Sequence, residues 1–403
     1  MFEIIDRDPN ATIIKVVGVG GAGGNAVEHM IREGVGGVEF ICCNTDAQAL
    51  KHSSAGVKLQ LGPGLGAGGK PERAREHAQG ERERIAEALG GAHMCFITAG
   101  MGGGTGTGAA PIVAEVAREL GILTVAVVTK PFEFEGRRGK IAEEGLAELA
   151  QQVDSLIVIL NEKLMEVLGE DVSMLEAFKS ADNVLKNAVG GIAEIINVPG
   201  LVNVDFEDVR TVMGEMGKAM MGSAMSAGVD RARIAAEAAV ASPLLEGIEL
   251  SGAKGVLVNI TASGSLGLKE YKEVMATIRN YTAPDATVIC GAVFDDGMED
   301  NLRVTVVATG LGSAAMARRK PELRTYVNEG AGLRTGTDNL TLGTGVSAAT
   351  TGTGTVTMGA ASTGGGLDDL FTSNRQRDSR AQAMSDTGMD KYDIPAFLRK
   401  QAD

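Results

Sequence analysis

Short apolar runs alternate with helical patterns through the first 160 residues of the chain. The runs are rich in β-branched residues and occupy positions 13–19, 38–42, 57–61, 94–98, 123–128 and 156–160. Continuous apolar strands separated by helices are typical of a parallel sheet whose two faces are both covered. The pattern therefore predicts an α/β domain built on a parallel sheet.

Two helical patterns stand out, one within this region and one after it. The first is a crossover helix with Pro111 in its first turn, and its apolar positions are Ile112, Val113, Val116, Ala117 and Leu120. The second is longer and steps by three or four through Phe178, Ala181, Leu185, Ala188, Ile192 and Ile195, until Pro199 and Gly200 break the pattern. We expect the second helix to connect two halves of the protein.

Beyond this helix the sequence predicts a second, smaller α/β domain. Strands are expected at 255–261, 287–294 and 302–308, with a helix at 269–281. Five methionines are expected to fill its core: Met213, Met216, Met220, Met221 and Met225.

The composition changes after Pro321. Residues 331–366 hold ten Gly and ten Thr, with only Arg334 and Asp338 charged, so this stretch is expected to be a flexible linker. The chain then ends on a short amphipathic segment with Ile394, Phe397 and Leu398 on one face. A tether that ends in such a segment is typical of partner binding.

The net charge, the amino-terminal residues and the cysteine spacing exclude several classes of protein. The formal net charge of −14 disfavours nucleic acid as a partner. The first fifteen residues lack a basic and an apolar signal region, and the chain has no apolar run of about 18 residues. Cys42, Cys43, Cys95 and Cys290 form no metal or disulfide spacing. We therefore expect a reduced, cytoplasmic protein that does not insert into membranes.

Glycine is concentrated in three loops, at 18–24, 62–69 and 100–108, each of which follows a predicted strand. The carboxyl ends of parallel strands meet at one edge of the sheet, where ligands bind. Glycine lets backbone N–H groups approach phosphate oxygens, with a helix N-terminus behind them. The loops together predict a nucleotide phosphate site.

The first two loops, taken alone, leave alternatives open. Gly18, Gly20 and Gly23 fit the dinucleotide fingerprint of a nicotinamide oxidoreductase, but the second strand ends in Asn44 rather than an acid. Residues 64–70 fit the start of a P-loop, but Pro71 replaces its Ser or Thr.

The third loop contains the tubulin signature GGGTGTG at 102–108. Together with the first loop, it makes the chain resemble the FtsZ family of bacterial cell-division GTPases, which are homologues of tubulin. The resemblance runs from Lys15 to Leu311 and resumes at 393–400. It includes residues 44–46, 130–136 and 203–208.

The resemblance implies a parallel-sheet nucleotide-binding domain that a long central helix joins to a smaller α/β domain, with a disordered linker and a C-terminal peptide. The implied segments are an N-terminal extension (1–12), a GTP-binding domain (13–172), the central helix (173–200), a C-terminal GTPase-activating domain (201–315), the linker (316–390) and a partner-binding peptide (391–403).

It also implies the nucleotide contacts. The phosphates would lie against the first and third loops, the ribose on Glu135, the base on Phe178, and the guanine edge near Asp182 and Asn183. The full set is Gly20, Gly21, Ala22, Gly23, Gly24, Asn25, Asn44, Asp46, Gly102, Gly103, Gly104, Thr105, Gly106, Thr107, Gly108, Glu135, Phe178, Asp182 and Asn183. The resemblance, not the spacing, selects GTP and GDP over ATP.

Two positions depart from the family pattern. Lys70 stands where the family has Asn, after a loop about four residues short. Gly139 replaces an arginine, which leaves Arg137, Arg138 and Lys140 as substitutes.

The acidic loop 203–208 carries the expected catalytic residues Asn203, Asp205 and Asp208. Its alternative interpretation is a helix N-cap with solvated acids. In the family this loop closes on the nucleotide of the next subunit, where the two carboxylates polarise the attacking water. The resemblance also implies Mg²⁺, which would offset the repulsion between these carboxylates and the triphosphate.

The sequence thus predicts a GTPase that polymerises head to tail in the division ring beneath the inner membrane. Two alternatives stay open: a nicotinamide-dependent oxidoreductase and a non-hydrolysing GTP-binding scaffold. Membrane-tethering and regulatory division proteins would bind the terminal peptide through Ile394, Phe397, Leu398, Arg399 and Lys400.

Overall fold

The computed structural model describes residues 12–169, 172–197, 204–215, 217–245 and 252–311. All of them belong to the first of two units into which the chain divides, Met1–Arg324. The predicted linker and terminal peptide, including the five partner-binding residues, lie outside the described residues, as do Asn203 and Met216.

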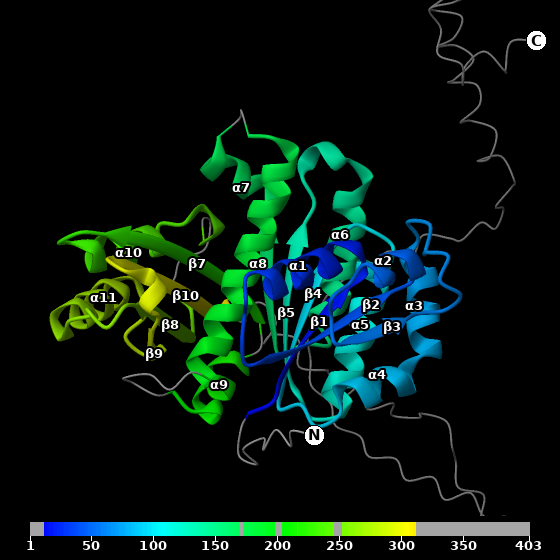
Figure 1. Ribbon diagram of the computed structural model, residues 1–403, viewed down its shortest axis with the longest axis horizontal. Coiled ribbons are helices and arrows are strands. Elements are labelled where there is room, and N and C mark those ends of the chain that lie inside the picture. Colours follow the sequence, from blue (N-terminus) through cyan, green and yellow to red (C-terminus); the bar gives the residue numbers. More distant parts are fainter. Residues whose placement is uncertain (1–11, 170–171, 198–203, 216, 246–251, 312–403) are drawn as a thin grey trace, which may run out of the picture. The chain divides into compact units, whose positions relative to one another are not determined.

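The first half is built on six parallel strands in the order β3-β2-β1-β4-β5-β6 (Figure 1). They are β1 (Ile14–Val19), β2 (Val38–Asn44), β3 (Val57–Gln60), β4 (Met94–Gly100), β5 (Leu123–Lys130) and β6 (Ser155–Leu160). The predicted parallel sheet is confirmed, and each of the six apolar runs forms one of its strands.

Helices cover both faces of this sheet. Val16 of β1 belongs to a buried cluster with Met30 and Leu185, while its neighbour Val17 belongs to another with Ile97 and Val113. Successive strand residues point to opposite faces, so this division places a core on each side. The helices are α1 (Gly20–Arg32), α2 (Ala47–Lys51), α3 (Pro71–Gly80), α4 (Arg82–Leu89), α5 (Thr105–Glu119), the 3-10 turn η1 (Glu133–Glu135), α6 (Arg137–Leu149) and α7 (Asn161–Leu168).

The predicted long helix is α8 (Met174–Asn197), with 24 residues. It runs between the strands of the first half and those of the second (Figure 1). Its buried stripe includes Leu185, Ala188 and Ile192, which pack in one cluster with residues of β1, β5 and β8. The helix therefore supports both halves.

The second half extends the same sheet by four strands in the order β7-β10-β8-β9. Strand β7 pairs in parallel with β6, and β10 is antiparallel to both of its neighbours. Its elements are α9 (Phe206–Met213), β7 (Gly217–Ala227), α10 (Arg231–Val240), the 3-10 turn η2 (Pro243–Leu245), β8 (Gly255–Ala262), α11 (Leu268–Tyr281), β9 (Thr287–Phe294), the 3-10 turn η4 (Asp296–Met298) and β10 (Asn301–Leu311). The three predicted strands and the predicted helix are confirmed.

Strand β7 was missed by the sequence analysis. Its sequence GKAMMGSAMSA has no β-branched residue, so intrinsic propensity does not mark it, and its pairing with β10 defines it as a strand. Met213, Met220 and Met221 are buried as predicted, but Met225 is 61% exposed because it lies near the end of β7. The expectation that Met225 fills the core was wrong.

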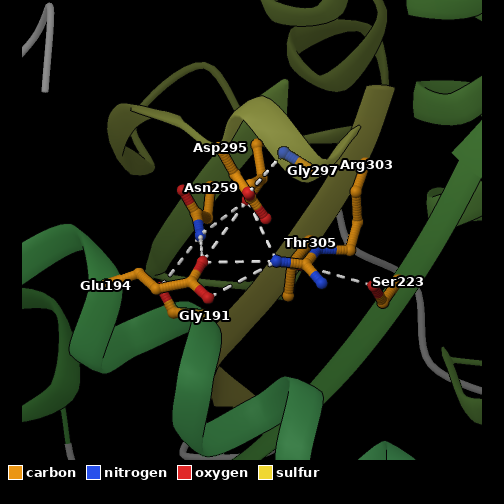
Figure 2. Close-up of polar contacts among 9 residues, drawn as sticks. Gly191, Glu194, Ser223, Asn259, Asp295, Gly297, Arg303 and Thr305 are labelled. Carbon is orange, nitrogen blue, oxygen red and sulfur yellow. Dashed lines mark hydrogen bonds and ion pairs between the residues drawn. The ribbon is translucent and has the colours of Figure 1, made fainter. Parts of the chain in front are cut away.

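A polar network joins α8 to strands β8 and β10 (Figure 2). The carboxylate of Glu194 accepts hydrogen bonds from Asn259 of β8 and Arg303 of β10, at 3.4 and 3.3 Å. The amide of Asn259 also donates to the carbonyl oxygen of Gly191 at 3.1 Å. Asn259 is buried and the side chains of Arg303 and Glu194 are partly buried, so their pairing helps to hold β8 and β10 against α8.

Candidate functional site

The three glycine loops meet at the carboxyl ends of the six parallel strands, as predicted. A Cβ atom added to Gly20 would lie 2.9 Å from the backbone nitrogen of Gly106, which puts the first loop against the third. A Cβ added to Gly104 would lie 3.0 Å from the backbone nitrogen of Lys70, which puts the third loop against the second. The close approach of all three backbones requires glycine at these positions.

Residues 44–46 hold the second loop to the third. The hydroxyl oxygens of Thr45 and Thr105 lie 2.6 Å apart, and the backbone N–H of Gly66 donates to the carbonyl oxygen of Thr45 at 2.8 Å. The side chain of Asp46 caps α2 by accepting from the N–H of Gln48, and Asn44 accepts from the N–H of Asp46. Asn44 and Asp46 therefore shape the rim of the site.

The glycines of the site divide into two kinds. A Cβ on Gly106 or Gly108 would run into the carbonyl oxygen of Gly100 or Pro71, so these two glycines allow packing. A Cβ on Gly21, Gly24 or Gly103 would meet no other described atom within 4 Å. Tight packing explains the first kind, and the second kind borders open space in which a ligand would fit.

Free backbone donors face the same region. The helices α1 and α5 begin at Gly20 and Thr105, and neither N-cap residue, Val19 or Gly104, places a described side chain on the first N–H groups. The first N–H groups of a helix have no partner within the helix and favour an anion. Two helix N-termini that converge on open space can therefore hold phosphates.

Glu135 is held in place beside this cradle. Its carboxylate accepts from the backbone N–H of Phe132 at 3.1 Å and pairs with the guanidinium of Arg138 at 2.7 Å. Its side chain is only 14% exposed. Among the three basic candidates near Gly139, Arg138 is thus the one in contact with the predicted ribose residue.

Phe178, Asp182 and Asn183 lie in the first turns of α8, beside α1. The ring of Phe178 is 43% exposed and contacts Phe132 edge to face, with centroids 5.7 Å apart. Burial raises the pKa of Asp182 to about 6, and the nearby His29 of α1 opposes this shift. Asn183 bonds to the same histidine, because its Oδ1 lies 2.7 Å from Nε2 of His29.

Asn161, which was not predicted from the sequence as a site residue, follows β6 directly at the same edge. It is 4% exposed, and its Oδ1 has no hydrogen-bond partner among the described residues. A buried acceptor without a partner carries a desolvation penalty that a ligand N–H group would remove. An asparagine placed directly after a fully apolar strand was the available signal.

The acidic loop lies far from the glycine loops of the same chain. Phe206 contacts His93 edge to face, with centroids 6.1 Å apart, and His93 precedes β4 at the amino edge of the sheet. The glycine loops stand at the carboxyl edge, roughly 20 Å away along a strand of this length. The side chain of Asp205 caps α9, as the alternative interpretation predicted, and Asp208 lies in the same turn.

The described residues offer no metal site built from side chains alone. Within the described ranges no three His, Cys, Asp or Glu side chains come close enough to bind an ion together. A magnesium ion at this site would take most of its ligands from phosphate oxygens and water, as this ion commonly does. The helices of the same ranges include none that is long and apolar enough to cross a membrane.

Comparison with known proteins agrees with this geometry. The family model for the Tubulin/FtsZ family, GTPase domain, matches residues 13–169, and that for the FtsZ family, C-terminal domain, matches residues 217–312. The cell division protein FtsZ of Pseudomonas putida is 60% identical over 318 residues, which cover 78% of this chain and 80% of that protein. The chain belongs to the FtsZ family.

Further relatives extend the match. The cell division protein FtsZ of Azotobacter vinelandii is 51% identical over an alignment of 414 positions, which covers 100% of this chain and 100% of that protein. A solved structure of an empty FtsZ dimer from M. jannaschii has a TM-score of 0.73 and 44% identity, and the match covers 76% of this chain and 90% of that one.

Membership confirms the predicted fold and the predicted function, a tubulin-like GTPase of cell division that forms polymers. The chain therefore binds guanine nucleotide. The matches do not support the oxidoreductase or scaffold alternatives.

Proposed function

We propose that this GTPase assembles head to tail and hydrolyses GTP in a site shared by two subunits. The observation that carries the proposal is the separation of the glycine loops from Asp205 and Asp208, at opposite edges of one sheet. A contact that joins one edge of a subunit to the other edge of the next repeats without closing and generates a filament. Such a contact brings the two half-sites together.

Each half-site has a distinct chemical task. The N–H groups of the glycine loops and of the helices α1 and α5 hold the phosphates, and Glu135 holds the ribose. The carboxylates of Asp205 and Asp208 from the next subunit orient the attacking water, with Asn203 of the same loop beside the γ-phosphate. Magnesium bound to the phosphates would offset the negative charge that these carboxylates bring.

The terminal peptide would connect the filament to the division site. Ile394, Phe397 and Leu398 would fill an apolar groove on membrane-tethering and regulatory proteins, and Arg399 and Lys400 would meet acidic residues at its rim. Contact with the inner membrane is then indirect, through these partners.

Hydrolysis and light scattering, measured together against protein concentration with GTP and magnesium, test the shared site. We expect turnover per subunit to rise at the concentration at which scattering begins. Full turnover well below any scattering would show that one subunit holds the complete site.

A mixing experiment tests the division of labour directly. Asp208→Ala removes an acid, and Gly21→Ala fills the phosphate cradle, so each variant alone should hydrolyse little GTP. In an equal mixture that copolymerises at random, about one junction in four pairs an intact cradle with an intact acidic loop. Recovered activity supports the proposal, and a mixture as inactive as its components contradicts it.

The scaffold alternative makes a different prediction for Asp208→Ala. A scaffold that only binds GTP would keep the same nucleotide lifetime in its polymers. If the acid acts in hydrolysis, Asp208→Ala polymers should retain GTP for much longer than wild-type polymers.

A further inference from the structure

We propose that His29 is a positioning residue for base recognition. It fixes the side-chain amide of Asn183 so that the NH₂ group faces the base and selects a purine with a carbonyl at C6. The inference rests on the proposed nucleotide site and extends it, because nothing in the glycine loops distinguishes one base from another. It also gives a role to a histidine for which the sequence suggested none.

The placement of five side chains supports the proposal. His29 follows Asn25 by four residues on α1, and Asp182 follows Phe178 by four residues on α8, so each pair shares one helix face. His29 and Asn183 are 154 positions apart in sequence, yet Nε2 of the ring lies 2.7 Å from Oδ1 of the amide. The bond therefore joins the two helices beside the residue on which the base would stack.

The hydrogen-bonding capacity of an amide explains the selectivity. Asn183 has one acceptor oxygen and one NH₂ group with two N–H donors. The contact joins Nε2 of His29 to Oδ1. Since an amide oxygen only accepts, we assign the hydrogen to Nε2, and the group left for a ligand is then the NH₂ donor. A C6 carbonyl, as in guanine or hypoxanthine, accepts a hydrogen bond from this NH₂ group. Adenine has an amino group at C6, which is itself a donor, so no hydrogen bond forms there.

In this proposal Asp182 binds the N1–H and 2-amino groups on the same edge of guanine. An ionised carboxylate only accepts, and guanine presents two donors, N1–H and the 2-amino group, next to its C6 carbonyl. One donor from Asn183 and two acceptors from Asp182 therefore complement guanine in order. Without the bond to His29 the amide of Asn183 could rotate by half a turn and offer its oxygen to an adenine amino group.

Nucleotide affinities measured on the full chain below its assembly threshold separate these roles. We use GTP, ATP and ITP, since ITP keeps the C6 carbonyl and lacks the 2-amino group. For His29→Ala we expect the preference for GTP over ATP to fall about tenfold, the equivalent of one hydrogen bond. The preference for GTP over ITP should stay as in the wild type, because Asp182 still reads the 2-amino group.

Two further variants make the test specific. His29→Gln places an N–H donor near the original Nε2 and should restore most of the GTP preference. His52→Ala, at an exposed histidine that ends α2, should change neither ratio.

The outcomes that overturn the inference are distinct from a failure of the proposed function. If His29→Ala weakens GTP and ATP equally, or changes only the melting temperature, His29 is a spacer between α1 and α8. If His29→Gln behaves like His29→Ala, the donor is not what matters. A wild-type chain without any preference for GTP over ATP would instead contradict the nucleotide assignment itself.

Discussion

The backbone N–H of Asp208 donates a 2.8 Å hydrogen bond to the side chain of Asp205, which makes Asp205 the N-cap of α9. The helix-cap interpretation and the catalytic interpretation of the acidic loop are therefore compatible. The cap fixes the first turn of α9, and this turn presents both carboxylates at the edge of the subunit. The capping hydrogen bond therefore orients the two carboxylates that we propose act in GTP hydrolysis.

Substitutions at Asp205 can separate these two roles. Asp205→Asn keeps a capping oxygen and removes the charge, so stability should change by only a few tenths of a kcal/mol. Asp205→Ala removes the cap as well and should lower the free energy of unfolding by about 1 kcal/mol. Both should reduce polymer-dependent GTP hydrolysis by about 100-fold or more. Chemical denaturation and phosphate release measure the two effects, and an active Asp205→Asn variant would restrict this residue to capping.

The two kinds of glycine predict opposite effects on stability. Gly21→Ala meets no described atom and adds a helix-forming residue near the start of α1, so the nucleotide-free protein should gain up to about 1 kcal/mol while losing nucleotide affinity. Gly108→Ala drives its Cβ into the carbonyl of Pro71 and should destabilise by about 1–3 kcal/mol.

Denaturation without nucleotide and equilibrium binding of GDP test this pair. A Gly21→Ala variant that binds GDP normally would show that the open space beside α1 is not the phosphate site.

The raised pKa of Asp182 predicts a pH-dependent stability. Burial raises this pKa from 3.8 to about 6, so the native state binds the proton more tightly than the unfolded chain does. The free energy of unfolding of the nucleotide-free protein should therefore fall as the pH rises from about 4 to 6. Asp182→Asn removes this penalty and should stabilise the protein at pH 7.5 by about 1–2 kcal/mol, with allowance for solvent screening.

Binding should show the opposite trend at the same residue. The ionised carboxylate accepts the base donors, so GTP affinity should increase as the pH rises through about 6 and should be weak in Asp182→Asn. Urea titrations at pH 5 and 7.5 measure the free energy of unfolding, and GTP binding at both pH values measures the affinity. An Asp182→Asn protein less stable than wild type at pH 7.5 would contradict it.

Arg137 and Arg138 offer a matched pair of substitutions. Arg138 pairs with Glu135 at 2.7 Å, whereas Arg137 has no hydrogen bond or ion pair to any described residue. Exposed ion pairs contribute little to folding, so Arg138→Ala should change the free energy of unfolding by less than about 1 kcal/mol. By freeing Glu135, Arg138→Ala should weaken GDP binding several-fold, and Arg137→Ala should not. Equal effects of the two substitutions would mean that only net charge matters.

Much of the first half was predictable because its signals are local. The inner strands β1, β4, β5 and β6 are largely buried and leave mostly apolar runs, and glycine loops follow strands where backbones must approach one another or a phosphate. The resemblance carried by residues 102–108 then supplied the choice of nucleotide, which no pattern of burial encodes. Strand β7 left no such signal, because its Gly, Ala, Ser and Met residues become a strand only by pairing with β10.

The sequence by itself determined the parallel sheet, the three glycine loops and the family, since periodicity and a specific motif are properties of neighbouring residues. Only the tertiary structure decided which distant side chains meet. It bonds His29 to Asn183 and pairs Arg138 with Glu135, and among the described residues it gives the buried Oδ1 of Asn161 no hydrogen-bond partner. It also places Asp205 and Asp208 at the edge opposite the glycine loops. These relationships depend on how helices and loops pack on the sheet, and spacing along a chain does not record that packing.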